Sequence, residues 1–256
     1  MMLKDKVCVV AGAGSPRGIG YATAQLFAEH GAKVVMLDIA MDAGIVDGLK
    51  AALPAGAARD ADVRGIRCDI TSLQDCRRAV EGIVTQHGSI DCLVNSAGVV
   101  RGTPMLSIEE DEYERILEVN LKGTFNLCQS VLPVMVARGS GSIVNLSSSA
   151  AQRGGGLVGG AHYAASKGGV IGLTRTIARE FGPKGVRANI VCPAMIETAM
   201  LDGLPDERMK DILEAIPLQR AGSPREAAGA CLFLASDLGG FVTGATLDVN
   251  GGSHIH

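Results

Sequence analysis

Short apolar runs alternate with longer amphipathic segments along nearly the whole chain. The apolar runs are typical of buried parallel strands and lie near residues 6–11, 32–38, 63–69, 90–95, 142–147, 186–191 and 245–249. Helical patterns lie near residues 18–30, 42–53, 72–87, 109–137, 162–182, 207–215 and 224–236. Strands separated by helices pair in parallel through right-handed crossovers. The pattern predicts an α/β fold, with one doubly wound parallel sheet of about seven strands and helices on both faces.

No internal repeat or linker divides residues 1–256, and the chain is long enough for one large domain. Residues 195–223 interrupt the alternation of strands and helices with a mixture of Met, Leu and charged side chains. Loops at the carboxyl ends of strands carry function in such folds, so we expect a small substrate lid there. Residues 55–62 are expected to form an alanine-rich loop with no evident role.

A glycine-rich segment joins the first expected strand to the first expected helix: Ala11-Gly12-Ala13-Gly14-Ser15-Pro16-Arg17-Gly18-Ile19-Gly20. Glycines let the backbone approach a pyrophosphate, and a helix N-terminus offers free N–H groups and a partial positive charge. A strand, a glycine-rich turn and a helix in this order predict a dinucleotide site on a Rossmann sheet.

Asp38 ends the second expected strand, about twenty residues beyond the glycine-rich segment. A carboxylate at that place accepts hydrogen bonds from the hydroxyls of the adenosine ribose. It would also repel the additional 2′-phosphate of NADP. We therefore expect NAD, rather than NADP, as the cofactor.

Tyr163 and Lys167 are four residues apart in the helical pattern AHYAASKGGVIGLTRTIAREF, so both lie on one helical face. A phenol titrates near ~10, and a fixed positive charge nearby lowers its pKa. The pair can therefore act as an acid and base for an alcohol or a carbonyl. A Tyr and a Lys at this spacing also occur by chance on surfaces, so the prediction depends on the glycine-rich segment as well.

The ordered motifs resemble the short-chain dehydrogenase/reductase family from about Lys6 to Gly252. Further matching segments are Cys68-Asp69-Ile70-Thr71, Asn95-Ser96-Ala97-Gly98, Val119-Asn120-Leu121-Lys122-Gly123, Ile143 to Ser148, Pro193 to Thr198, Val242-Thr243-Gly244 and Asn250-Gly251-Gly252. Among short single-domain members, the chain is similar to 3-oxoacyl-carrier-protein reductases and to polyol and sugar dehydrogenases.

The resemblance implies an oxidoreductase that transfers a hydride between NAD(H) and a secondary alcohol or ketone. It assigns proton transfer to Tyr163, contact with the substrate oxygen to Ser148 rather than Ser147 or Ser149, and a relay water to Asn120. Lys167 would lower the pKa of Tyr163 and bind the nicotinamide ribose. The expected cofactor contacts are Gly12, Gly14, Arg17, Gly18, Ile19, Gly20, Asp38, Asp69, Ile70, Asn95, Ala97, Gly98, Tyr163, Lys167, Pro193, Ile196 and Thr198.

Several positions depart from the family pattern. Pro16-Arg17 is an insertion that leaves either Gly12 or Gly14 as the first glycine of the motif. Arg17 favours NADP, because a basic residue there can pair with the 2′-phosphate in relatives, but it is equally explained as a surface charge. Ser96 and Ala194 replace a family Asn and Gly, and a glycine-rich insertion covers residues 154–160.

The substrate is expected to be a polyol, a sugar or a hydroxy acid. The alternative is an NADPH-dependent 3-oxoacyl-carrier-protein-type reductase, which would need a basic docking patch near the mouth of the site. Arg138 and Lys184 are candidates for such a patch, although solvated helix-end charges explain them equally. A more remote alternative is a nucleotide-binding regulator without catalysis. A dehydratase or epimerase would generally carry a longer C-terminal substrate domain.

Composition narrows the class of protein further. The net charge of −3 gives no reason to expect nucleic acid, and no apolar run reaches membrane-spanning length. The N-terminus has no signal-peptide pattern, and seven dispersed cysteines indicate buried thiols, so we expect a cytoplasmic protein. Histidines show no ligand-spaced cluster, and no metal is expected. The C-terminal His254-Ile255-His256 is expected to be a mobile tail, or to reach a neighbouring subunit.

The patterns at residues 109–137 and 162–182 carry more apolar residues than one sheet-facing stripe requires: Val131, Val134, Val136, Val170, Ile171 and Leu173 are examples. Excess apolar helix surface indicates an interface. Relatives pair through these helices and the last strand, so the resemblance implies a homotetramer.

Overall fold

The computed structural model describes residues 1–58, 61–155, 158–202 and 205–256. Three expected features extend outside these ranges. Residues 59–60 belong to the loop expected at 55–62, residues 156–157 to the glycine-rich insertion, and residues 203–204 to the expected lid.

The described chain forms one seven-stranded sheet in the order β3-β2-β1-β4-β5-β6-β7, with every neighbouring pair parallel. The strands are β1 Val7–Ala11, β2 Lys33–Asp38, β3 Val63–Arg67, β4 Cys92–Asn95, β5 Gly141–Leu146, β6 Val186–Pro193 and β7 Thr246–Val249. All seven predicted strands are confirmed. The order reverses between β1 and β4, which is where doubly wound sheets bind ligands at their carboxyl edge.

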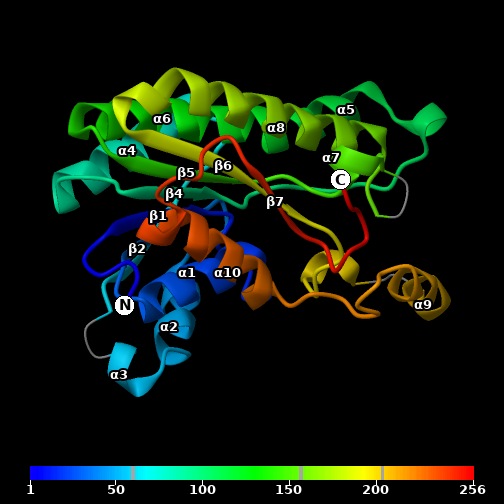
Figure 1. The fold of residues 1–256 in the computed structure, drawn as a ribbon, viewed down its shortest axis with the longest axis horizontal. Helices are drawn as coiled ribbons and strands as arrows, with labels where there is room; N and C mark the ends of the chain where they lie inside the picture. Colours follow the sequence, from blue (N-terminus) through cyan, green and yellow to red (C-terminus); the bar gives the residue numbers. More distant parts are fainter. Residues whose placement is uncertain (59–60, 156–157, 203–204) are drawn as a thin grey trace.

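Helices cover both faces of the sheet, as predicted (Figure 1). Alternate side chains of β1 enter the two cores: Cys8 and Val10 pack on one side, and Val7 and Val9 on the other. The first core faces α1 Ile19–Glu29, α2 Ala43–Ala51 and α10 Pro224–Ala235, and the second faces α4 Leu73–His87, α6 Gly123–Arg138 and α8 Ala161–Phe181. A sheet buried on both faces explains why its strands are continuous apolar runs.

Local signals set where the helices start and stop. Ser223 accepts from the Glu226 N–H, and the Glu226 carboxylate accepts from the Ser223 N–H, so the two form a capping box at the start of α10. At the start of α4 the Ser72 side chain caps the helix by accepting from the Asp75 N–H. The helix is followed by Gly88, whose φ of 78° suits a residue without a Cβ.

The helix predicted at residues 109–137 is interrupted. It consists of α5 Glu110–Leu117, a wide π turn η2 Glu118–Lys122, and α6. In the π turn the Gly123 N–H donates to the Glu118 carbonyl five residues back, and Asn120 is fully buried there. Such turns occur frequently at functional sites, because the extra residue redirects a side chain.

Short elements complete the chain. These are α3 Ala55–Ala58, where a loop was expected, α7 Ala150–Arg153, and the 3-10 turns η1 Met105–Ser107, η3 Gly182–Lys184, η4 Ala199–Leu201 and η5 Asp237–Gly239. The α9 helix, Asp206–Glu214, stands at the edge of the molecule beyond the end of β6 (Figure 1). Its Ile212 packs with Met195, Ile216 and Ala221 in a small separate core.

Candidate active site

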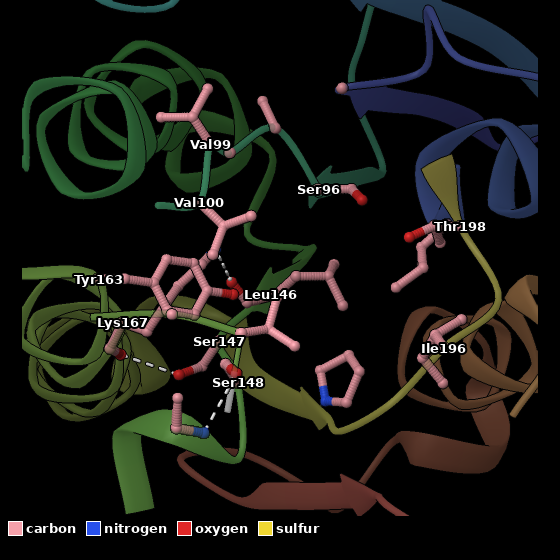
Figure 2. A pocket seen from close by; sticks show the side chains of 18 of the residues that line it. Ser96, Val99, Val100, Leu146, Ser147, Ser148, Tyr163, Lys167, Ile196 and Thr198 are labelled. Carbon is pink, nitrogen blue, oxygen red and sulfur yellow. Dashed lines mark hydrogen bonds between the residues drawn. The ribbon is translucent and has the colours of Figure 1, made fainter. Parts of the chain in front are cut away.

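The carboxyl ends of the strands open into a cleft of about 620 Å³. Most of the predicted site residues line it: Gly12, Gly18, Ile19, Asp38, Asp69, Ile70, Ala97, Gly98, Ser148, Tyr163, Lys167, Pro193, Ile196 and Thr198. Gly14, Arg17, Gly20, Asn95 and Asn120 do not belong to its lining. Figure 2 shows Tyr163, Ser148 and Lys167 on one side of this cleft, with Ile196 and Thr198 across from them.

The glycine-rich loop is packed too tightly for side chains. Gly12 has a φ of +78°, and a Cβ there would lie 2.3 Å from the Ala97 nitrogen. A Cβ on Gly20 would lie 2.2 Å from the Gly12 carbonyl oxygen. Gly12 directly follows β1 and is therefore the first glycine of the motif, whereas the Gly14 N–H donates to Asp38 Oδ2 at 2.9 Å.

The N-terminus of α1 faces the same cleft. Gly18 caps the helix in an extended conformation without a side-chain hydrogen bond, and both Gly18 and Ile19 line the cleft. Free N–H groups and the helix dipole make this a place for an anion.

Asp38 ends β2 and presents its carboxylate to the cleft. Oδ1 accepts from the Ala40 N–H at 3.0 Å and Oδ2 from Gly14, which fixes the side chain. Arg17, the possible phosphate partner, forms an ion pair with Asp202 near the lid instead. The charged group that lines the cleft at the end of β2 is thus a carboxylate.

Asp69 and Asn95 are placed differently from one another. Asp69 follows β3 and lines the cleft, and its Oδ1 accepts from the Thr71 N–H at 2.9 Å. Asn95 is buried in the sheet, where its Nδ2 donates to Asn145 Oδ1 at 2.8 Å. The Asn95 side chain therefore ties β4 to β5 and stands outside the cleft lining.

Ser148 and Tyr163 line the same cleft, and hydrogen bonding by Ser148 acts to lower the pKa of the Tyr163 phenol. Ser148 follows β5, and its Oγ also accepts from the Ala150 N–H at 3.1 Å. The neighbouring Ser147 donates to the Lys167 carbonyl at 2.8 Å and is 4% exposed. This geometry favours Ser148 over Ser147 as the serine that meets a substrate.

Burial has the largest effect on the pKa values of Tyr163 and Lys167. It raises the pKa of Tyr163 above its ordinary value, and the Ser148 hydrogen bond acts in the opposite direction. Burial lowers the pKa of Lys167 to about 8, while its Nζ donates to the Leu146 carbonyl at 2.9 Å. In this structure desolvation of the phenol therefore outweighs the effects that lower its pKa, and the expected lowering of that pKa by Lys167 stays a prediction.

Asn120 reaches the site through a loop. Its Oδ1 accepts from the Val99 N–H at 2.8 Å, and its Nδ2 donates to the Val99 carbonyl at 2.9 Å and to Ser166 Oγ at 3.0 Å. A Cβ on Gly98 would lie 3.1 Å from Asn120 Oδ1 and 3.3 Å from Lys167 Nζ. Asn120 thus holds the loop beside Lys167, and Oδ1 keeps one lone pair for a water.

Sequence reasoning missed much of the cleft wall. Apolar side chains from loops, η2 and the lid line the cleft: Val99, Val100, Val119, Val158, Met195, Leu201, Ile212 and Ile216. Arg115, Arg153 and Ser253 line it as well. These residues come from six separate stretches of chain, and only Val119 and Met195 lie within a motif.

Of the two interpretations left open for Arg138 and Lys184, the structure agrees with helix-end charges, since they lie in the last turns of α6 and η3. Arg138 pairs with Asp91 at 2.8 Å, and the Lys184 ammonium lies 4.8 Å above the Phe181 ring. Both precede strands, at the amino edge of the sheet, while the cleft lies at the carboxyl edge. They cannot form a docking patch at the mouth of the site.

The C-terminal segment is folded onto its own chain. His256 Nε2 lies 3.0 Å from Asp248 Oδ2, and Arg153 Nη1 donates to the Ser253 carbonyl at 2.9 Å. The C-terminus accordingly lies beside α7 in Figure 1. The C-terminal residues thus have polar partners within their own chain, and whether they also reach a neighbouring subunit stays a prediction.

Within residues 1–58, 61–155, 158–202 and 205–256, no three His, Cys, Asp or Glu side chains gather in a group that could hold a metal ion. No helix in these ranges is long and apolar enough to cross a membrane.

Comparison with known proteins gives consistent results. Residues 12–254 match a family model described as enoyl-(acyl carrier protein) reductase. The chain is 45% identical to an uncharacterised short-chain type dehydrogenase/reductase of Sinorhizobium fredii, over 100% of both chains. It is 40% identical to a 3-oxoacyl-[acyl-carrier-protein] reductase of Thermotoga maritima, over 98% of this chain and 99% of the other.

The fold has a solved counterpart. A short-chain type dehydrogenase/reductase from Mycobacterium ulcerans matches with a TM-score of 0.91 at 30% identity, over 99% of this chain and 91% of that one. The chain belongs to the short-chain dehydrogenase/reductase family of oxidoreductases.

Proposed function

We propose that this protein is an NAD(H)-dependent oxidoreductase that interconverts a secondary alcohol and a ketone. The observation that carries the proposal is the meeting of Ser148, Tyr163 and buried Lys167 in the cleft that the glycine-rich loop also lines.

The described residues fit a dinucleotide. Gly12 and Gly20 leave no space for a Cβ, the uncapped start of α1 offers N–H donors, and Asp38 offers carboxylate oxygens. Residues at the switch point between β1 and β4 would thus hold the pyrophosphate and the adenosine ribose. Bound NAD(H) would supply or accept the hydride at the reacting carbon.

The chain's own groups handle the proton and the developing charge. In reduction the Tyr163 phenol donates its proton to the carbonyl oxygen, and in oxidation the phenolate accepts it. Ser148 donates a hydrogen bond to the same oxygen and stabilises negative charge there. Lys167, when protonated, favours the phenolate, and Asn120 holds a water through which the proton leaves.

Asp38 supports a preference for NAD over NADP. Its carboxylate is fixed at the adenosine end of the cleft, and Arg17 is already paired with Asp202. A 2′-phosphate near Asp38 would suffer repulsion, where ~1.4 kcal/mol corresponds to tenfold in affinity. We expect at least ~10-fold higher kcat/KM with NAD(H), and Asp38→Ala should reduce that ratio. Equal efficiency of the unmodified protein with both cofactors would contradict the assignment.

The apolar wall supports a 3-oxoacyl or 3-hydroxyacyl substrate over a polyol or a sugar. A polyol needs several polar partners in its pocket, because each unmatched hydroxyl is costly to desolvate. The relatives named 3-oxoacyl-[acyl-carrier-protein] reductases support the same substrate class. Activity on short 3-oxo esters exceeding that on ketoses and polyols would agree with this proposal, and the reverse order would contradict it.

We also propose a cytoplasmic homotetramer. Phe125 on α6 is 44% exposed, and Leu238 and Phe241, which follow α10, are exposed as well. Val131 and Val170, expected on an interface, are fully buried in the subunit instead. Light scattering tests the assembly, and a monomeric mass at micromolar concentration would contradict it.

A further inference from the structure

The charges that line the cleft are segregated. Its acidic residues are Asp38 and Asp69, which end or follow β2 and β3 at the adenosine end. Apart from Lys167, its basic residues are Arg115 in α5 and Arg153 in α7, which flank the opposite end. No other acidic residue belongs to the described lining. Since the whole chain has a net charge of −3, this positive end is a local feature.

Arg153 is held in place without being neutralised. Its Nη1 donates to the Ser253 carbonyl at 2.9 Å, and no carboxylate of the described residues lies within ion-pair distance of it. Arg115, in contrast, is paired with Glu118 at 3.6 Å. The guanidinium of Arg153 therefore keeps its full charge and several free N–H donors.

The C-terminal segment supports this arginine. Gln152 donates to Asp248 Oδ1 at 2.8 Å, and His256 Nε2 lies 3.0 Å from Asp248 Oδ2. Asn250 donates to the His254 carbonyl at 2.8 Å, which closes the segment around Ser253. Two consecutive residues at the end of α7, Gln152 and Arg153, are thus tied to the end of the chain.

Arg153 is also close in sequence to the reacting groups. It follows Ser148 by five residues, and the single turn of α7 between them rises about 1.5 Å per residue. Arg153 also lines the same cleft as Ser148 and Tyr163, so its long side chain can meet an anionic group of a substrate whose carbonyl those two residues would hold.

We propose that Arg153, positioned by residues 250–256, binds an anionic group of the substrate. This anionic group is either the carboxylate of a 3-oxo acid or the phosphate of a pantetheine thioester. Both groups accept paired hydrogen bonds from a guanidinium. The inference rests on the proposed function and adds a specificity residue to it.

Matched substrates test the inference. One pair is acetoacetate and ethyl acetoacetate, and the other is acetoacetyl-coenzyme A and the acetoacetyl thioester of N-acetylcysteamine, which lacks phosphate. Arg153→Gln should raise KM for the charged member of one pair by at least ~10-fold, with the KM of its neutral partner and kcat within ~2-fold. The pair that responds identifies carboxylate or phosphate as the group bound. Arg153→Lys keeps the charge, so its KM for that charged substrate should lie between those of the unmodified protein and Arg153→Gln.

Two further variants of this chain complete the experiment. Arg77→Gln, an equal charge change at an exposed position on α4, should leave all four KM values unchanged. Deletion of His254–His256 should raise KM for the same charged member by a smaller factor, and no change there would reject the role of the C-terminal segment.

The outcomes separate this inference from the proposed function. Normal turnover of both members of a pair, with equal KM effects of Arg153→Gln on each or none on either, would overturn the inference alone. Absence of turnover with all four substrates would overturn the proposed function, and this inference with it.

Discussion

In the cofactor-free protein, burial of Lys167 should lower the free energy of unfolding near neutral pH. This cost should disappear at alkaline pH. The side chain is 5% exposed, and burial lowers its pKa from 10.5 to about 8. Each unit of difference between the folded and unfolded pKa corresponds to about 1.4 kcal/mol, so the cost near neutral pH is about 3 kcal/mol. The unfolded chain holds this proton between pH 8 and 10.5 while the folded protein releases it. The cost is therefore complete below pH 8 and fades as the pH rises toward 10.5.

Lys167→Met removes the charge and keeps the length of the side chain. Its absolute effect is mixed, because the Leu146 carbonyl loses a hydrogen bond, which costs about 1–3 kcal/mol. The difference in pH dependence is not affected by that loss. Urea unfolding from pH 7 to 10 should show the unmodified protein gaining about 1 kcal/mol per pH unit relative to the variant above pH 8.

A matched control uses Lys50→Met, at an exposed position in the last turn of α2. The difference in free energy of unfolding between Lys50→Met and the unmodified protein should not change with pH from 7 to 10. Parallel curves for Lys167→Met and the unmodified protein would refute the reasoning, since they would mean that Lys167 titrates alike in the folded and unfolded states.

Two other predictions follow from packing. Gly12→Ala should lower the free energy of unfolding by at least ~2 kcal/mol and abolish NADH binding in a fluorescence titration, because its φ is +78° and its Cβ would meet the Ala97 backbone. Gly172→Ala in α8, which has open space, should instead be neutral or stabilise by up to ~1 kcal/mol; similar losses in both variants would contradict the steric argument. The cysteines are all buried, and burial raises the pKa of Cys128 and of Cys231 to about 12. Native protein should therefore react slowly with a thiol reagent and quickly after unfolding, whereas fast stoichiometric labelling of native protein would contradict it.

The strands, and the meeting of Tyr163 and Lys167 in one cleft, could be predicted because their signals are local. Runs such as Val7–Ala11 are apolar at every position, as a strand buried on both faces requires. Tyr163 and Lys167 share a helical face by spacing alone, and α8 places both in the cleft. The position of Asp38 follows from β2 ending beside the glycine loop.

Other features depend on contacts between distant segments. The pairing of Arg17 with Asp202, and of Arg153 with Ser253, joins residues with no shared motif. The π turn at Glu118–Lys122 interrupts a helix whose apolar pattern continues through it, so periodicity alone extends one helix across it. The pKa of Tyr163 depends on desolvation by the whole fold, which no spacing rule supplies.

Transfer of deuterium tests the central claim most directly. The protein is incubated with NADH carrying deuterium at both hydrogens of the nicotinamide C4 and with ethyl acetoacetate, and the alcohol is analysed by mass spectrometry. We predict one deuterium on the carbinol carbon, and a rate at least ~100-fold lower for Tyr163→Phe with NADH binding retained. An alcohol without the label, or a Tyr163→Phe variant that reduces the ketone at the normal rate, would contradict the account.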